Sequence, residues 1–400
     1  MNSESAQPER KKRRRIWFPR FTIRILLILM VIVATALALG TREMQRLDRE
    51  SNAIQQLGEY GTVDVYRAPV LDESGLWYVE GPLNKSAWMR FVGGIIGENA
   101  FYPVLRLEVG KDYSKDGDER KDLNDPEFKK LISQFTLLES LRIGSCPFRN
   151  LDFLKGLTRL ENLNLYQSEE LVDIKGLAEL PRLKELCLGY GCKNLNDFVV
   201  FNSLPELQLL EIKDCPSIES MRVFAVLTKL KKLNLAGCNL QRLDGVENFA
   251  ELEDLDLTGC TKLKNIEGVE QLSKLKNVQF KGCDLVDLTP LSNLHSLRAV
   301  GVQGNLRLAD LMPIGGMSEL VFLNLADCES LESLDGLQGM KQLDDLVLTN
   351  CKSLVDVSAI HGLTQISNIA INGCRKLSRK ERGILKARLP KANLRTSGFL

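Results

Sequence analysis

The sequence predicts an α/β solenoid, in which one small unit of chain is repeated and stacked along an axis. Two observations lead to this prediction. An apolar register recurs eleven times within 400 residues, at steps of 22 to 24 residues. In each register the apolar residues first alternate as on a strand and then become more widely spaced. The registers begin at Leu138, Leu160, Leu183, Leu207, Leu230, Leu252, Leu275, Leu297, Leu320, Leu343 and Ile366.

One register shows what each position does. It reads Leu252-Glu-Asp-Leu255-Asp-Leu257-Thr-Gly-Cys260-Thr-Lys-Leu263-Lys-Asn-Ile266-Glu-Gly-Val269-Glu-Gln-Leu272, which is the leucine-rich repeat pattern. The L-x-x-L-x-L half predicts a strand whose leucines point into the solenoid. The second half predicts short 3-10 turns on the convex side. About ten strand spacings of about 4.8 Å give a curved parallel sheet of roughly 50 Å, which offers an elongated surface and not an enclosed pocket.

The N-terminal residues predict a single membrane anchor. Residues 1–20 form a basic tail, and residues 21–41 form an apolar run that can cross a hydrocarbon core of about 30 Å if the Arg24 guanidinium reaches back to the interface. The excess of Lys and Arg before this run places the N-terminus in the cytoplasm and the repeats outside the membrane. The protein is therefore predicted to be a single-pass membrane protein.

The helical pattern continues past the anchor over residues 42–58. Its apolar residues fall roughly on one stripe, and Gly58 ends it; they are Met44, Leu47, Ile54 and Leu57. A cleaved signal peptide is the alternative, because Ala36-Leu37-Ala38 fits a cleavage site. Cleavage would release a secreted protein.

Residues 59–135 predict a small α/β cap, which the first repeat needs because it would otherwise expose an unpaired strand edge. Asp125 and Pro126 give the N-cap and the first-turn proline of a helix that runs to about Gln134. Short strands are predicted at residues 63–66, 76–79 and 104–109.

Residues 136–374 hold the repeats, and residues 375–400 predict a C-terminal capping helix and tail. This last segment contains nine Lys and Arg residues and one Glu. We expect its charges to face water while its apolar side chains cover the last repeat; these are Ile384, Leu385, Ala387 and Leu389.

One column of the repeats holds small polar side chains, and nine of the ten cysteines lie in it. The interpretation is a buried structural ladder bonded to the backbone turn. Disulfides between neighbours remain an alternative outside the cell, although parallel Cβ atoms would be too far apart. Cys187 lies outside the column and is the one candidate for a reactive thiol. The column comprises Cys146, Ser168, Cys192, Cys215, Cys238, Cys260, Cys283, Asn305, Cys328, Cys351 and Cys374.

The residues between the inward leucines predict a binding surface on the concave side. One patch is acidic, and a flatter apolar patch contains Ala299 and Gly301. Exposed aromatic and apolar groups beside polar ones are typical of protein interfaces, whereas the plain alternative is an ordinary solvated strand face. The predicted surface comprises Tyr166, Glu185, Tyr190, Glu211, Lys232, Asp254, Asp256, Phe322 and Val347.

No motif in the sequence indicates an enzyme, a metal site or a cofactor. There is no P-loop and no G-x-S-x-G, and the chain has only two histidines. The middle of the chain is acidic, which argues against nucleic acid. We therefore predict a non-enzymatic, membrane-tethered module that binds a protein or an envelope polymer. A structural spacer of the cell envelope is the alternative, and an enzyme that uses the cap through Asp64, Glu80 or Glu98 is a third hypothesis.

The repeats resemble the short bacterial, SDS22-like leucine-rich repeats, and residues 287–294 are similar to part of the internalin repeat. The whole chain resembles planctomycete membrane-anchored leucine-rich repeat proteins. The matching segments are residues 20–27, 53–58 and 385–394. The resemblance implies the fold, the lineage and the topology, and it implies no reaction.

Overall fold

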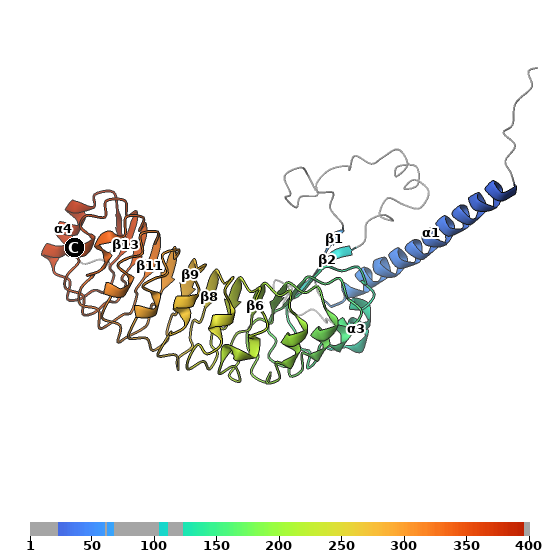
Figure 1. The fold of residues 1–400 in the computed structure, drawn as a ribbon, viewed down its shortest axis with the longest axis horizontal. Helices are drawn as coiled ribbons and strands as arrows, with labels where there is room; N and C mark the ends of the chain where they lie inside the picture. Colours follow the sequence, from blue (N-terminus) through green and yellow to red (C-terminus); the bar gives the residue numbers. More distant parts are fainter. Residues whose placement is uncertain (1–22, 61, 68–103, 111–122, 396–400) are drawn as a thin grey trace, which may run out of the picture.

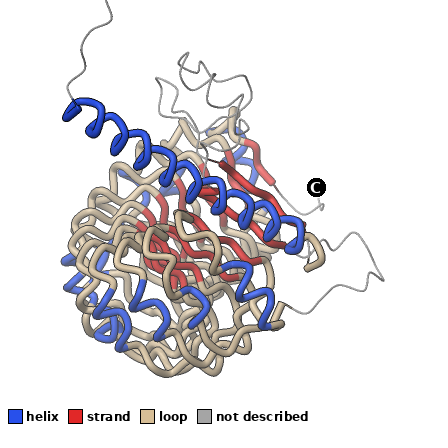
Figure 2. The backbone as a smooth tube through the Cα atoms, turned by 90° about the vertical axis from the view of Figure 1, so that its right-hand side faces the viewer, coloured by secondary structure: helices blue, strands red, loops and turns tan. Residues whose placement is uncertain are grey.

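The computed structural model describes residues 23–60, 62–67, 104–110 and 123–395. Their fourteen strands form one sheet in chain order from β1 to β14, on the inner side of a curved solenoid (Figure 1). Short helices lie on the outer side, away from the strands (Figure 2). The predicted repeat solenoid with parallel strands is confirmed.

Each of the first ten repeats contributes a strand of three or four residues and, on the convex side, a short 3-10 helix, whereas the strand of the eleventh repeat is followed by an α-helix (Arg379–Arg388). The repeat strands are β3 (Ser140–Ile143), β4 (Asn162–Leu165), β5 (Glu185–Cys187), β6 (Leu209–Glu211), β7 (Lys232–Asn234), β8 (Asp254–Asp256), β9 (Asn277–Gln279), β10 (Ala299–Gly301), β11 (Phe322–Asn324), β12 (Asp345–Val347) and β13 (Asn368–Ala370). The 3-10 helices are η2 (Asp152–Leu154), η3 (Lys175–Glu179), η4 (Val199–Ser203), η5 (Met221–Phe224), η6 (Val246–Asn248), η7 (Val269–Gln271), η8 (Thr289–Leu291), η9 (Met312–Ile314), η10 (Leu337–Gly339) and η11 (Ser358–Ile360).

The inward side chains of successive repeats form the core. Leu233, Leu255 and Val278 are direct neighbours on β7, β8 and β9, and each is at most 2 % exposed. One continuous cluster of buried side chains runs from Ala53 to Leu389. Full burial of one such side chain contributes about 1.5–3 kcal/mol, before the entropy of ordering is subtracted. Contacts between neighbouring repeats therefore hold the solenoid together.

Each turn that follows a strand from β4 to β13 contains a residue with left-handed backbone. Gly237 has a φ of 72°, and Asp214 and Asn350 hold the same conformation in other repeats at 52° and 60°. Asn and Asp tolerate this region better than other non-glycine residues. Side chains also define the convex turns, since Asp287 Oδ1 accepts a hydrogen bond of 2.8 Å from Thr289 N at the start of η8.

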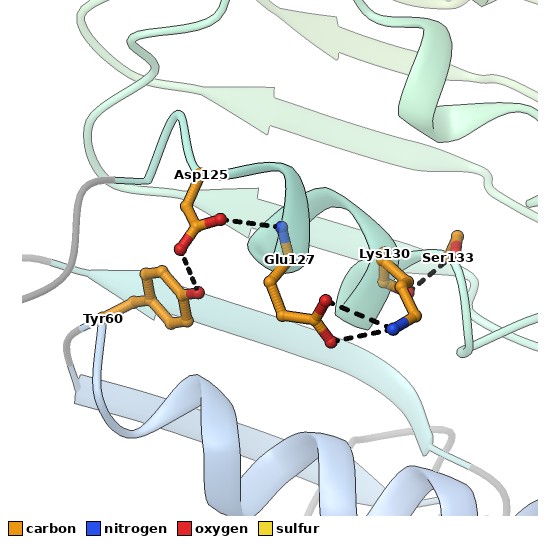
Figure 3. Close-up of polar contacts among 5 residues, drawn as sticks. All are labelled: Tyr60, Asp125, Glu127, Lys130 and Ser133. Carbon is orange, nitrogen blue, oxygen red and sulfur yellow. Dashed lines mark hydrogen bonds and ion pairs between the residues drawn. The ribbon is translucent and has the colours of Figure 1, made fainter.

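The N-terminal cap closes the first edge of the sheet. Strand β1 (Thr62–Arg67) pairs antiparallel with β2 (Val104–Gly110), which is parallel to β3. Helix α3 (Pro126–Ile132) begins after Asp125, whose Oδ1 accepts from Glu127 N at 2.9 Å (Figure 3). Asp125 Oδ2 accepts from the Tyr60 hydroxyl at 3.1 Å, which joins this turn to the end of α1. The predicted strand at residues 76–79 lies outside the described residues.

A single helix, α1 (Ile23–Leu57), spans the predicted anchor and the predicted juxtamembrane helix without a break. It projects from the N-terminal end of the solenoid (Figure 1). Within the described part of the chain, no helix combines the length and the apolar character that a membrane crossing needs. Most side chains of residues 21–41 lie outside that part, so the anchor stays a prediction.

The buried stripe of α1 differs from the expected one. Met44 is 40 % exposed and Leu47 is half-buried. Two charged side chains take their place, because Arg46 Nη1 donates to Glu50 Oε1 at 2.6 Å and Glu50 Oε2 accepts from Val104 N at 3.4 Å. The buried residues are Arg46, Glu50, Ala53 and Leu57.

The C-terminal end is covered by α4 (Arg379–Arg388) and β14 (Asn393–Arg395). Ser378 Oγ caps α4 by accepting from Glu381 N at 3.0 Å. Of the four side chains expected to cover the last repeat, Leu385 and Leu389 are buried, Ile384 is half-buried and Ala387 is exposed. The sequence did not predict β14, which pairs in parallel with β13.

Candidate functional site on the concave face

A shallow depression crosses the middle of the concave face, over β6 to β9. Its volume is about 190 Å³, and it is open to solvent. Four of the predicted surface residues line it together, and amide side chains that the prediction left out lie among them. The lining residues are Leu209, Leu210, Glu211, Lys232, Leu233, Asn234, Asp254, Leu255, Asp256, Asn277 and Gln279. We call these residues the central depression.

The other five predicted surface residues lie outside the central depression. Glu185 is exposed on β5, one strand away. Tyr166 and Tyr190 follow β4 and β5 in their turns, and Phe322 and Val347 lie half-buried on β11 and β12. The nine residues share one face of the sheet, but they do not form one site.

The charges of the central depression are compensated by neighbouring strands. Lys232 Nζ lies 3.4 Å from Asp254 Oδ2 across β7 and β8, and Asn277 Nδ2 donates to Asp254 Oδ1 from β9. Lys213 Nζ lies 2.9 Å from Glu211 Oε1. The patch expected to be acidic therefore contains side chains of both charges, which are linked by ion pairs and hydrogen bonds.

Asp256 also has a structural role that the sequence analysis missed. Its Oδ1 accepts from Thr258 N at 2.9 Å, as Asn234 and Asn324 Oδ1 accept from Ala236 and Ala326 N at 3.0 Å. The remaining oxygen of Asp256 accepts from Asn234 Nδ2 at 3.3 Å. The recurrence of Asn and Asp at this position is the sequence signal for this turn, which shapes the floor of the depression.

Gly301 is the residue of the apolar patch that lies beside the central depression, next to Gln279 in the sheet. A Cβ atom at Gly301 would collide with the side-chain amide of Gln279, so the glycine lets this amide lie across β10. Phe322 is the direct neighbour of Ala299 in the sheet. The polar and apolar surfaces consequently meet at Gln279.

Two cations lie over aromatic rings at the N-terminal side of the face. Lys213 Nζ is 4.7 Å from the Tyr190 ring centre, and the Arg142 guanidinium is 4.9 Å from that of Tyr166. Burial disfavours the charged form of Lys213, but the hydrogen bond and the charge of Glu211 outweigh it and raise the pKa of Lys213. These pairs hold the two tyrosines in place.

All eleven side chains of the polar column are buried, and the ten cysteines are unpaired. Seven of the nine thiols in the column donate to carbonyls of the preceding repeat, as Cys260 Sγ does to Leu235 O at 3.3 Å and Cys351 Sγ to Leu325 O at 3.1 Å. Ser168 Oγ donates to Leu165 O at 3.0 Å. The column satisfies main-chain carbonyls where one repeat meets the next.

Cys187 lies on the concave face but is a poor nucleophile. Burial, followed by the charges of Glu211 and Glu185, raises the pKa of its thiol to about 12, so it carries little thiolate near neutral pH. Elsewhere in the described residues, no three His, Cys, Asp or Glu side chains are placed to hold a metal ion. Of the three acids considered for the cap, Asp64 is exposed on β1, while Glu80 and Glu98 lie outside the described residues.

Two protein families match the repeats of this chain. A family described as the BspA type leucine rich repeat region matches residues 129–241 and 319–381, and a second, described as leucine rich repeats, matches residues 228–271. This chain is a leucine-rich repeat protein. Its repeats are of the bacterial type.

A solved internalin structure shows the same leucine-rich repeat fold. This internalin of Listeria monocytogenes superposes with a TM-score of 0.58 at 16 % identity, over 78 % of this chain and 90 % of that one. At such identity the likeness to the internalin shows the fold alone. A leucine-rich repeat protein of Leptospira interrogans gives a TM-score of 0.43 at 18 % identity, over 66 % of this chain and 86 % of that one.

One curated relative matches by sequence, the disease resistance protein RPP2A of Arabidopsis thaliana. It is 37 % identical over 111 residues, which are 26 % of this chain. The match spans 8 % of the plant protein, so nothing about the remainder of that protein carries over to this chain.

Proposed function

We propose that this leucine-rich repeat protein is a non-enzymatic, membrane-tethered binding module whose central depression receives an extended segment of a partner protein. The observation that carries this proposal is the depression itself, with its donors and acceptors on four adjacent strands. Repeat solenoids use such concave surfaces for binding. An envelope polymer is the other partner class, and the polar groups of the depression could also bind its hydroxyl or carboxyl groups.

The carboxylates of the depression support binding and not catalysis. Asp254 is held by Lys232 and Asn277, and Asp256 is held by Asn234 and by the turn. Acid–base catalysis is typical of enclosed sites that exclude water, whereas these carboxylates lie on an open sheet face.

The tether is proposed from α1 and the residues before it. Residues 21–41 are apolar and follow a basic tail, and their backbone is helical from Ile23 onward. This arrangement supports a cytoplasmic N-terminus with the repeats outside the membrane. The planctomycete lineage that the flanking segments imply is, like the tether, a proposal.

Site-specific crosslinking in the native cells tests the binding module. A photo-crosslinking residue replaces Asn277 in the depression or, as the control, the exposed Lys262, which lies outside the depression in the turn region between β8 and η7. We expect one partner at position 277 and none at 262, and Asp254→Lys should weaken the purified complex at least tenfold. Equal crosslinking from both positions would contradict the proposal, and protease treatment of intact cells tests on which side the repeats lie.

A further inference from the structure

The charges of the solenoid and of its C-terminal end are segregated. Residues 136–374 hold 23 Lys and Arg against 32 Asp and Glu, a net charge of −9, while residues 375–400 hold nine against one. Nine of the 23 repeat cations pair with acids of a neighbouring repeat, as Lys229 does with Glu206 and Lys274 with Glu251, both at 2.6 Å. Ion pairs between repeats thus recur along the solenoid.

This compensation stops at the last repeat. Eight cations there are exposed, and none of them forms an ion pair with another described residue; they are Arg375, Lys376, Arg379, Lys380, Lys386, Arg388, Lys391 and Arg395. We call them the basic cap surface. The ninth cation, Arg382, is structural, because it donates to Cys374 O at 2.6 Å and to Leu377 O at 3.2 Å.

The basic cap surface has one continuous open face on α4. Arg379, Lys380 and Lys386 share the exposed side of the helix with Gly383 and Ala387, so no bulky side chain separates the cations. Helix α4 lies at the end of the solenoid opposite α1 (Figure 1). This surface is therefore remote from the predicted anchor and from the central depression.

We propose that the basic cap surface binds a flexible polyanion with repeated phosphate groups. Lys and Arg donate charge-assisted hydrogen bonds to phosphate oxygens, and release of counterions from the polymer favours the complex. No large apolar side chain is exposed within residues 375–395 to insert into a bilayer, and this segment has no aromatic residue to stack on a base. The proposal does not depend on the function of the concave face.

Titration of the full chain in a non-ionic detergent with linear inorganic polyphosphate tests this assignment. The cap variant combines Arg379→Gln, Lys380→Gln, Lys386→Gln and Arg388→Gln. The control combines Lys229→Gln, Lys274→Gln, Lys276→Gln and Lys352→Gln, which changes the net charge equally by removing paired lysines. We expect the cap variant to bind at least tenfold more weakly with a shallower salt dependence, and the control to change less than twofold.

Several results would overturn the assignment. Equal weakening by both variants would mean that net charge, and not this surface, sets the affinity. Binding to anionic vesicles or duplex DNA without binding to polyphosphate would assign a different partner. Self-association that the cap variant abolishes, without polyphosphate binding, would assign a second copy of the chain. Circular dichroism of both variants shows whether the fold is retained.

Discussion

At the junction between repeats, Cys, Ser and Asn occupy the same buried position and satisfy main-chain groups of their own or of the preceding repeat. A thiol makes one weak bond, as from Cys283 Sγ to Leu257 O at 3.3 Å. Asn305 makes three stronger ones: it donates to Phe280 O and Val302 O at 2.9 and 2.7 Å, and it accepts from Leu285 N at 2.9 Å. A small side chain able to donate one hydrogen bond is what this position requires, and the thiol meets this need with little desolvation.

The buried thiols make stability fall at alkaline pH. Burial raises the pKa of Cys260 and Cys283 from 9.0 to about 12. The folded chain keeps these protons while the unfolded chain releases them, so their contribution is complete below about pH 9 and is lost as pH rises toward 12. Each thiol should cost about 1 kcal/mol per pH unit within this window.

Urea unfolding at pH 8 and pH 10 measures this dependence. The double variant Cys260→Ser, Cys283→Ser should lose less stability between the two pH values than the natural chain does. Ser168→Ala, in the same column, should shift the midpoint equally at both. A double variant with the same pH dependence as the natural chain would refute the idea.

Individual roles on the concave face could be predicted only in part. The repeat register alone places Asp254 and Asp256 on the concave side, because side chains alternate along a strand. It does not show that Lys232 and Asn277 compensate Asp254, since these contacts join residues 22 and 23 positions apart across three strands. The turn role of Asp256 is visible in the sequence only once Asn234 and Asn324 are read as its equivalents.

At the scale of elements, the end of α1 is part of the cap and not a separate linker. Glu50 is fully buried, paired with Arg46 and bonded to the first residue of β2. The Tyr60 ring packs edge-on against Phe128 of α3 at 5.2 Å. These contacts join the end of α1 to β2 and α3, elements that are distant in sequence.

Loss of the Glu50 carboxylate should release α1 from the cap. Glu50→Ala breaks the buried Arg46–Glu50 ion pair and removes the acceptor of Val104 N, which should cost about 3–5 kcal/mol. Hydrogen exchange of residues 50–60 should therefore become at least a hundredfold faster. The exposed Asp48→Ala is the control and should have no effect; equal rates in the two variants would show that the ion pair does not hold the helix.

Sequence reasoning found the main elements but not how their ends are fixed. It located α3 and α4 from capping residues and proline, which act locally. It did not predict that Arg46 and Glu50 lie on the buried stripe of α1, because charged side chains are normally expected to face water. The two side chains can be buried because they form an ion pair with each other. Sequence reasoning also missed β14, whose three residues have no alternating apolar pattern and form a strand only because β13 offers an open edge.

At the scale of the whole molecule, each repeat contacts chiefly its neighbours, so repeats can be removed without breaking the others. Two deletions of nearly equal length keep the register. Removal of residues 252–296 takes away β8 and β9 of the central depression, and removal of residues 297–342 takes away β10 and β11. The two shortened chains differ in the surface that remains.

A binding module and a spacer respond differently to these deletions. If the central depression binds the partner, removal of residues 252–296 should abolish capture of the crosslinked partner. Removal of 297–342 should preserve most of the capture. Both chains should remain folded by circular dichroism. Full capture by both would favour the structural spacer and contradict the binding role.

Helix α1 has 35 residues, which corresponds to a rod of about 52 Å at about 1.5 Å per residue. The N-terminal end of α1 projects away from the solenoid, and its C-terminal end is bonded to β2 through Glu50. A rotation of α1 about its own axis would therefore turn the whole solenoid with it. The azimuth at which the concave face is presented is thus set by whatever holds the first turns of α1.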